Sequence, residues 1–140
     1  MILFNMLALF IGDAPDVPIE ALADKMQSRF GGNPTFRLEY ETLPFNTERN
    51  LILRWEGWTA RLFRETAEDD ENVVEDSLQI AQLLGKTAPA GIGDSTRRIR
   101  AVFYDDPEEK FIDEMVEIMS ILEGLDGVVV FDPQQNKIMD

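Results

Sequence analysis

Three aspartates are the residues of this sequence whose type and position best suit catalysis. Asp105 and Asp106 follow the alternating segment 98–104, and Asp132 follows the apolar run 128–131. Carboxylates at strand ends can converge on Mg²⁺ and support phosphoryl chemistry, so a Mg²⁺-dependent hydrolase is one hypothesis. The same residues also end strands and start turns for ordinary backbone reasons, and no motif fixes a nucleophile. We therefore expect no catalytic residue, no metal and no other cofactor, and a protein that is not an enzyme.

The composition narrows the chemistry further. The 140 residues include no Cys and no His, which removes disulfides, the thiol nucleophile, the commonest zinc ligand and the usual proton shuttle at neutral pH. The chain has 13 Lys and Arg against 27 Asp and Glu, for a formal net charge of −14. Such a surface repels nucleic acid and anionic lipid and favours partners with basic surfaces. We expect a protein partner of that kind, no nucleic acid and no membrane.

Two groups of acidic residues are candidates for contact with such a partner. The ordinary explanation for both is a solvated loop and a helix start, where the helix dipole favours anions. The functional explanation is a docking surface. The first acidic cluster consists of Glu68, Asp69, Asp70, Glu71, Glu75 and Asp76, and the second acidic cluster consists of Asp105, Asp106, Glu108 and Glu109.

Arginines form a third candidate surface. Strand alternation places five of the 13 basic residues on one outward sheet face, namely Arg37, Arg54, Arg61, Arg98 and Arg100. Cross-strand pairing with Glu39 and Glu41 is the structural explanation. The functional explanation is that Arg54, Arg61 and Arg100 hold a partner after it has docked, since arginine is frequent among the residues that dominate interfaces.

The hydrophobic pattern predicts the strands that carry these residues. The opening segment has no basic start and no cleavage site of an export signal, so we expect a buried first strand there. A turn is expected at Pro44 and Asn46. The predicted strands lie within 1–13, 35–41, 50–65 (a hairpin), 98–104 and 128–131.

The hairpin is predicted down to its register. A two-residue turn at Glu56 and Gly57 suits closely paired strands, because glycine readily adopts positive φ. That turn sets Trp55 opposite Trp58 on the face that also carries the leucines of the hairpin. We therefore expect both tryptophans in the core, although aromatic pairs beside arginine also anchor interfaces.

Apolar residues at helical spacing predict three helices. The first follows Asp16, which can cap it, the second follows the first acidic cluster, and the third spans 107–123. The expected buried stripes are Ile19, Leu22, Ala23, Met26 and Phe30, then Val74, Leu78, Ala81 and Leu84, and finally Phe111, Met115, Ile118, Met119 and Leu122.

These elements indicate a single domain over residues 1–140 with an α+β fold. We expect a two-layer sandwich, in which a mixed, mostly antiparallel sheet of about six strands carries about three helices chiefly on one face. A strand, a helix and a second strand occur twice, at the start and at the end of the chain, which we interpret as a similarity of architecture.

The segment RRIRAVFYDDPEEKFIDEMVEIMSILEGLDGVVVFDP, with its basic strand, DDP helix start and closing GVVVFDP strand, resembles the C-terminal segment of small immunity proteins. Those proteins are encoded beside bacterial polymorphic toxins, including contact-dependent inhibition and type VI secretion effectors. The resemblance covers under a third of the chain and implies the binding and neutralisation of one cognate toxin.

Charge and resemblance together predict a cytoplasmic, non-enzymatic immunity protein that occludes the active site of a toxin with a basic surface. The Mg²⁺-dependent hydrolase and a non-catalytic regulatory subunit remain the alternatives. The sequence leaves the oligomeric state and the identity of the toxin open.

Overall fold

The computed structural model describes residues 2–44 and 48–139. Its fold is α+β, and within these residues three α-helices accompany one sheet of seven strands, where about six were expected. The strands are β1 (Ile2–Phe10), β2 (Arg37–Thr42), β3 (Arg49–Trp55), β4 (Trp58–Thr66), β5 (Arg97–Tyr104), β6 (Val128–Asp132) and β7 (Lys137–Ile138). The helices are α1 (Ile19–Phe30), α2 (Asn72–Leu84) and α3 (Ile112–Glu123), and two short 3-10 turns, η1 (Gly85–Thr87) and η2 (Ile92–Asp94), follow α2.

The strand order is β2-β3-β4-β5-β1-β6-β7, and each neighbouring pair is antiparallel, so the described sheet is antiparallel throughout rather than mixed. It follows that β1 and β2 run in the same direction, and that β5 and β6 do so too. Helix α1 connects the first of these pairs and α3 the second, which confirms the repeated architecture. The two connections cross the sheet in opposite directions and start from oppositely directed strands. Because both helices lie on one face, both crossovers have the same hand.

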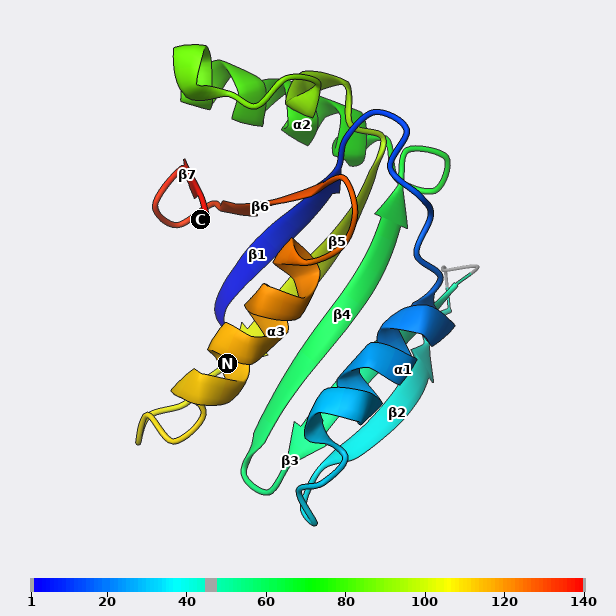
Figure 1. Ribbon diagram of the computed structural model, residues 1–140, viewed down its shortest axis with the longest axis vertical. Coiled ribbons are helices and arrows are strands. Elements are labelled where there is room, and N and C mark those ends of the chain that lie inside the picture. Colours follow the sequence, from blue (N-terminus) through cyan, green and yellow to red (C-terminus); the bar gives the residue numbers. More distant parts are fainter. Residues whose placement is uncertain (1, 45–47, 140) are drawn as a thin grey trace.

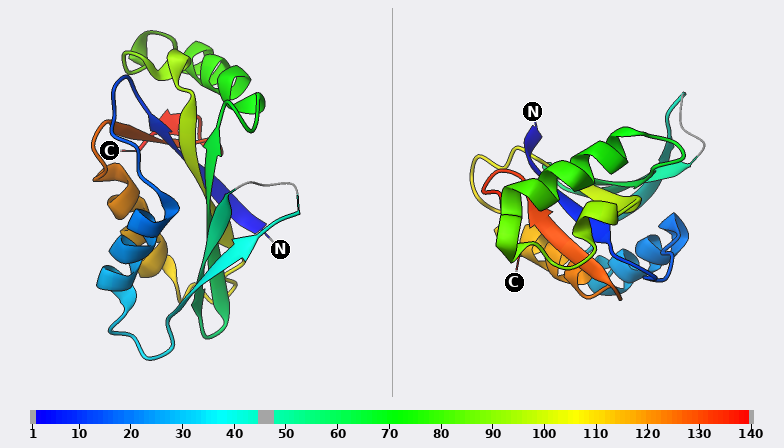
Figure 2. Two further views of the ribbon diagram at one scale, coloured as in Figure 1. Left: turned by 90° about the vertical axis from the view of Figure 1, so that its right-hand side faces the viewer. Right: turned by 90° about the horizontal axis from the view of Figure 1, so that it is seen from above.

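Helices α1 and α3 cover one face of the sheet and enclose the main core (Figure 1; Figure 2, left). The predicted stripe of α1 is buried at all five positions, and α3 buries Met115, Ile118 and Leu122. The strands contribute alternate residues, as expected for a sheet with one covered face. From the three central strands these are Met6, Ala8, Phe10, Ala60, Leu62, Ile99, Ala101 and Phe103.

Helix α2 lies at one end of the sheet and packs against the opposite face (Figure 1). Ile80 of α2 and Ile92 of η2 meet Leu7 and Leu9 of β1 and Phe131 of β6 in a second, smaller core. Strand β6 is therefore covered on both faces, as the apolar run at 128–131 predicts. Two of the three helices share a face, and the third stabilises the other side.

The predicted phase of α2 is wrong in the first half of the helix only, since Ala81 and Leu84 of the predicted stripe pack against the smaller core. The helix buries Val73, Ser77 and Ile80, whereas Val74 and Leu78 of the predicted stripe are exposed. Ser77 is polar, so the hydrophobic pattern of the sequence does not mark its position as buried. Its hydroxyl oxygen lies 2.8 Å from the carbonyl oxygen of Val73 and 2.9 Å from that of Ser95. A buried hydroxyl that donates to a carbonyl avoids most of the cost of leaving water.

The predicted hairpin is confirmed in register. Strands β3 and β4 pair with Trp55 opposite Trp58, and the turn glycine, Gly57, has φ +87°. Both tryptophans are buried, with ring centroids 5.3 Å apart. They belong to an aromatic cluster that reaches Phe30 of α1, 5.0 Å from Trp55, and Phe111 beside α3, 5.2 Å from Trp58. This cluster connects both helices to the hairpin.

Two predicted helix starts differ from the structure. The third helix begins at Ile112 rather than at 107, because Asp106 accepts hydrogen bonds from the backbone N–H groups of Lys110 and Phe111 and thereby holds a turn ahead of the helix. Asp16 does not cap the first helix. Its carboxylate pairs instead with Arg64 of β4. Asn46 of the expected turn lies outside the described residues.

Candidate functional site

The predicted arginine face lies on the side of the sheet opposite α1 and α3, but Arg98 does not face outward as expected, because it is buried against Asp76 of α2. Each arginine singled out for partner contact already has a carboxylate neighbour. Arg54 pairs with Glu39 at 2.8 Å, and Arg61 pairs with Glu41 at 3.3 Å. These cross-strand pairs are the structural explanation given above, and they make this face a surface of alternating charge rather than a positive patch.

Tyr104 extends this network at the end of β5. The guanidinium of Arg61 donates to the Tyr104 hydroxyl at 2.6 Å. Burial alone would lower the pKa of Arg61, but the hydrogen bonds to Glu41 and Tyr104 outweigh it and raise that pKa. Arg61 therefore remains charged, and its hydrogen-bonding groups are largely engaged within the protein.

Arg100 and Arg98 share one glutamate. Glu65 of β4 accepts from Arg98 at 2.9 Å and from Arg100 at 3.2 Å, and Arg98 also donates to Asp76 of α2 at 2.8 Å. Arg98 is 5% exposed. Burial alone would lower its pKa, but the bonds to Asp76 and Glu65 outweigh it and raise the pKa. Asp76, predicted as a partner contact, thus serves to attach α2 to the sheet.

The rest of the first acidic cluster lies in the loop before α2 and on the first turns of that helix. Glu68, Asp69, Glu71 and Glu75 are exposed. Asp70 accepts from the backbone N–H of Asn72 at 2.9 Å, an ordinary local turn contact. Four of the six predicted residues are therefore available to a partner on one end of the molecule.

The second acidic cluster lies at the other end of the sheet, in the loop between β5 and α3 (Figure 1). Asp105, Glu108 and Glu109 are exposed, and Glu108 pairs with Lys110 at 2.6 Å. Asp106 is taken up by the backbone of that loop. The full length of β5 separates the two clusters, so they form two surfaces rather than one.

The carboxylates of the hydrolase hypothesis do not come together. Leu7 of β1 pairs with Arg100 on one side and with Phe131 on the other, so Asp132 lies level with Ala101, well short of Asp105. Asp132 accepts from the backbone N–H groups of two residues that follow it, at 2.9 and 3.3 Å. Among the described residues, no three His, Cys, Asp or Glu side chains are grouped so that they could hold a metal ion.

The outer face of α2 is the surface feature that sequence reasoning missed. Val74 is 40% exposed and Leu78 49%, one helical turn apart. The exposed carboxylates of Glu71 and Glu75 lie on the same side of the helix. Val73 and Val74 are adjacent, and an apolar stripe can begin at either of them. The pattern alone therefore could not distinguish the buried face of the helix from the outer one.

Comparison of the chain with protein-family models, with curated proteins and with solved structures finds no match. Within residues 2–44 and 48–139, no helix has both the length and the apolar character needed to cross a membrane.

Proposed function

We propose that this protein is a cytoplasmic immunity protein that binds one cognate bacterial toxin with a basic surface and occludes the toxin's active site. The observation that carries the proposal is the outer face of α2, where exposed apolar side chains lie among carboxylates. This combination suits an interface, since burial of the apolar residues supplies affinity while the acidic rim selects a basic partner.

The charge of the whole protein supports the same partner. A formal net charge of −14 attracts a basic protein over a distance, and the two acidic clusters concentrate that field at both ends of the sheet. The resemblance of residues 97–133 to the C-terminal segment of immunity proteins gives the partner its class, a toxin.

The α2 surface is also held firmly in place. Arg98 of β5 bonds to Asp76, and the Ser77 hydroxyl oxygen lies 2.9 Å from the carbonyl oxygen of Ser95, so the helix is attached to β5 and to the segment just before it. A rigid surface loses little conformational entropy when it binds. Helix α2 therefore presents Val74 and Leu78 in a fixed orientation, which favours tight and specific association.

The test uses the toxin domain encoded beside this gene. Its catalytic activity is measured with one equivalent of this protein, and the dissociation constant is measured by calorimetry. We expect full inhibition by the natural protein. The double substitution Val74→Ala, Leu78→Ala should raise the dissociation constant by at least about tenfold, as truncation of central interface residues does.

Ile112→Ala is the matched control, because Ile112 is an equally exposed apolar residue, 47%, on α3. It should leave inhibition and affinity unchanged. An adjacent toxin that does not bind this protein would refute the proposed function. A complex that tolerates the double substitution would refute the assignment of α2 as its interface.

A further inference from the structure

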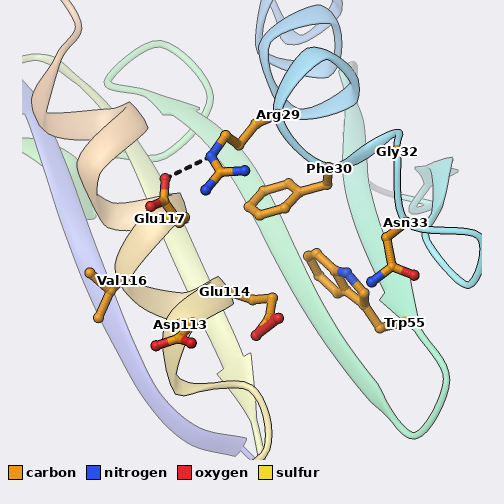
Figure 3. A pocket seen from close by; sticks show the side chains of 9 residues that line it. All are labelled: Arg29, Phe30, Gly32, Asn33, Trp55, Asp113, Glu114, Val116 and Glu117. Carbon is orange, nitrogen blue, oxygen red and sulfur yellow. Dashed lines mark hydrogen bonds and ion pairs between the residues drawn. The ribbon is translucent and has the colours of Figure 1, made fainter.

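A groove of about 560 Å³ lies between α1 and α3 on the helical face (Figure 3), at the end of the sheet away from α2 (Figure 1). We call it the α1–α3 groove. Its aromatic part is formed by Phe30 and Trp55, and α3 forms the acidic wall with Asp113, Glu114 and Glu117. The remaining lining residues are Arg29, Gly32, Asn33 and Val116.

One carboxylate oxygen of this wall is unexplained by the fold. The Oε2 atom of Glu114 is buried and has no hydrogen-bond partner among the described residues. Buried polar atoms are almost always bonded, and an exception is explained by a water, an ion or a ligand group that supplies the missing donor. In Figure 3 the Glu114 side chain extends from α3 into the groove, on the side of Phe30 and Trp55. The missing donor would therefore enter from the groove.

The internal cation of the groove is already engaged. Arg29 pairs with Glu117 at 2.8 Å across the gap between the helices (Figure 3). The hydrogen bond from Arg29 lowers the pKa of Glu117, which keeps that carboxyl ionised. Asp113 and Glu114 lie in the first turn of α3 and add two further carboxylates to the wall. The wall of the groove is thus acidic beyond what Arg29 neutralises.

The chemistry of the lining selects an organic cation. Within the described residues no three carboxylates gather as a metal site, so a bare metal ion would lack ligands. A guanidinium suits both parts of the groove, since its N–H groups bond to carboxylates and its flat face stacks on aromatic rings. The last turn of α1 ends at this groove, and the negative end of its dipole also favours a cation.

We infer that the α1–α3 groove binds the guanidinium of an arginine side chain supplied by the basic partner. This inference rests on the proposed function for the source of the arginine. The groove volume is within the range of small-ligand sites and leaves room for the aliphatic stem of the arginine as well as its head group. Glu114 accepts from the guanidinium, and Trp55 and Phe30 contact its face and stem.

The test titrates N-acetyl-arginine amide into ¹⁵N-labelled protein and follows the two indole N–H signals by NMR. Trp55 lines the groove, whereas the Trp58 indole N–H donates to the Tyr104 carbonyl at 2.9 Å. We expect a saturable shift of the Trp55 signal with roughly millimolar affinity and a smaller shift of the Trp58 signal. N-acetyl-citrulline amide has nearly the same shape and no charge, so it should produce no saturable shift.

Glu114→Gln should weaken the arginine probe by about tenfold or more, because it removes the charge that accepts the guanidinium. Asp126→Asn is the control, since it removes one exposed carboxylate outside the groove and should change nothing. If Glu114→Gln proves unfolded by circular dichroism, Asp113→Asn, at an exposed position of the same wall, replaces it and should weaken the probe in the same direction.

An absent Trp55 shift, equal shifts with the citrulline probe, or undiminished binding by the folded groove variant would overturn the inference. None of these results depends on a toxin. If the groove fails this test but the protein still inhibits the adjacent toxin, only the arginine site is refuted. If the groove binds the arginine probe but the protein does not bind the toxin, only the proposed function is refuted.

Discussion

Replacement of Arg98 by alanine tests how α2 is held in the orientation that exposes its outer face. The substitution removes two charge-assisted hydrogen bonds, to Glu65 at 2.9 Å and to Asp76 at 2.8 Å. Loss of one partner from a buried pair costs about 3–5 kcal/mol when the remaining charge stays buried and uncompensated. Here Glu65 keeps Arg100 at 3.2 Å, and the Asp76 side chain, 41% exposed, regains water. We therefore expect a cost at or just below the lower end of that range, about 2–3 kcal/mol.

The assay is urea denaturation of the natural protein and of Arg98→Ala, with Arg54→Ala as the control. The Arg54 pair with Glu39 leaves both side chains more than two-fifths exposed, so its loss should cost no more than about 1 kcal/mol. Because the folded pKa of Arg98 is raised, its stabilisation is fully present below the unfolded pKa and is lost only as pH rises through the folded pKa. The difference between Arg98→Ala and the natural protein should stay constant across the neutral range in which every arginine is charged. Equal costs for the two variants would refute this reasoning.

Two further predictions concern which face of α2 is buried and how the stability of the protein changes at acidic pH. Ile80→Ala should cost about 2–5 kcal/mol in denaturant melts and Leu78→Ala within about 0.5, and the reverse order would restore the stripe predicted from sequence. The bond from Arg64 lowers the folded pKa of Asp16, so the stabilisation by Asp16 is present above its unfolded pKa and is lost as pH falls through the folded value. Thermal melts of Asp16→Asn should accordingly match those of the natural protein at low pH and fall below them near neutrality, and a gap that persists in acid would contradict this.

The fold was predictable where local rules determine it. The β3–β4 register follows from a two-residue turn with glycine at its positive-φ position, which sets Trp55 opposite Trp58 whatever the rest of the chain does. The stripe of α1 is equally local, because a single apolar face fits helical spacing. The fold class, the hairpin register and the buried faces of α1 and α3 could therefore be predicted without any knowledge of distant contacts.

The phase of the first half of α2 could not be predicted from the sequence, because it depends on a contact distant in sequence. Ser77 is buried through a bond to the backbone of Ser95, 18 residues further along, and no window around the helix contains that information. The start of α3 depends on how Asp106 uses its two carboxylate oxygens. Sequence reasoning considered this aspartate as a metal ligand or a partner contact. In the structure its carboxylate accepts hydrogen bonds from the backbone of its own loop.

The candidate surfaces show the same division. Alternation correctly put Arg54, Arg61 and Arg100 on one face, but their neutralisation by glutamates depends on the strand order. The α1–α3 groove is lined by residues near 30 and residues near 115, so no motif in either segment alone predicts it. Surfaces assembled by packing of distant segments are the part of the function that a linear pattern does not contain.

The most direct test of the proposed docking surface is the rate at which this protein associates with the toxin domain proposed as its partner, measured by surface plasmon resonance at several salt concentrations. Opposite fields raise the encounter rate, and the Debye length shrinks from about 30 Å at 0.01 M to about 8 Å at physiological ionic strength. We predict a steep fall of the association rate with salt. Glu71→Gln, Glu75→Gln should lower this rate and flatten its salt dependence, with a smaller effect on dissociation. An association rate indifferent to salt and to these two charges would contradict the account.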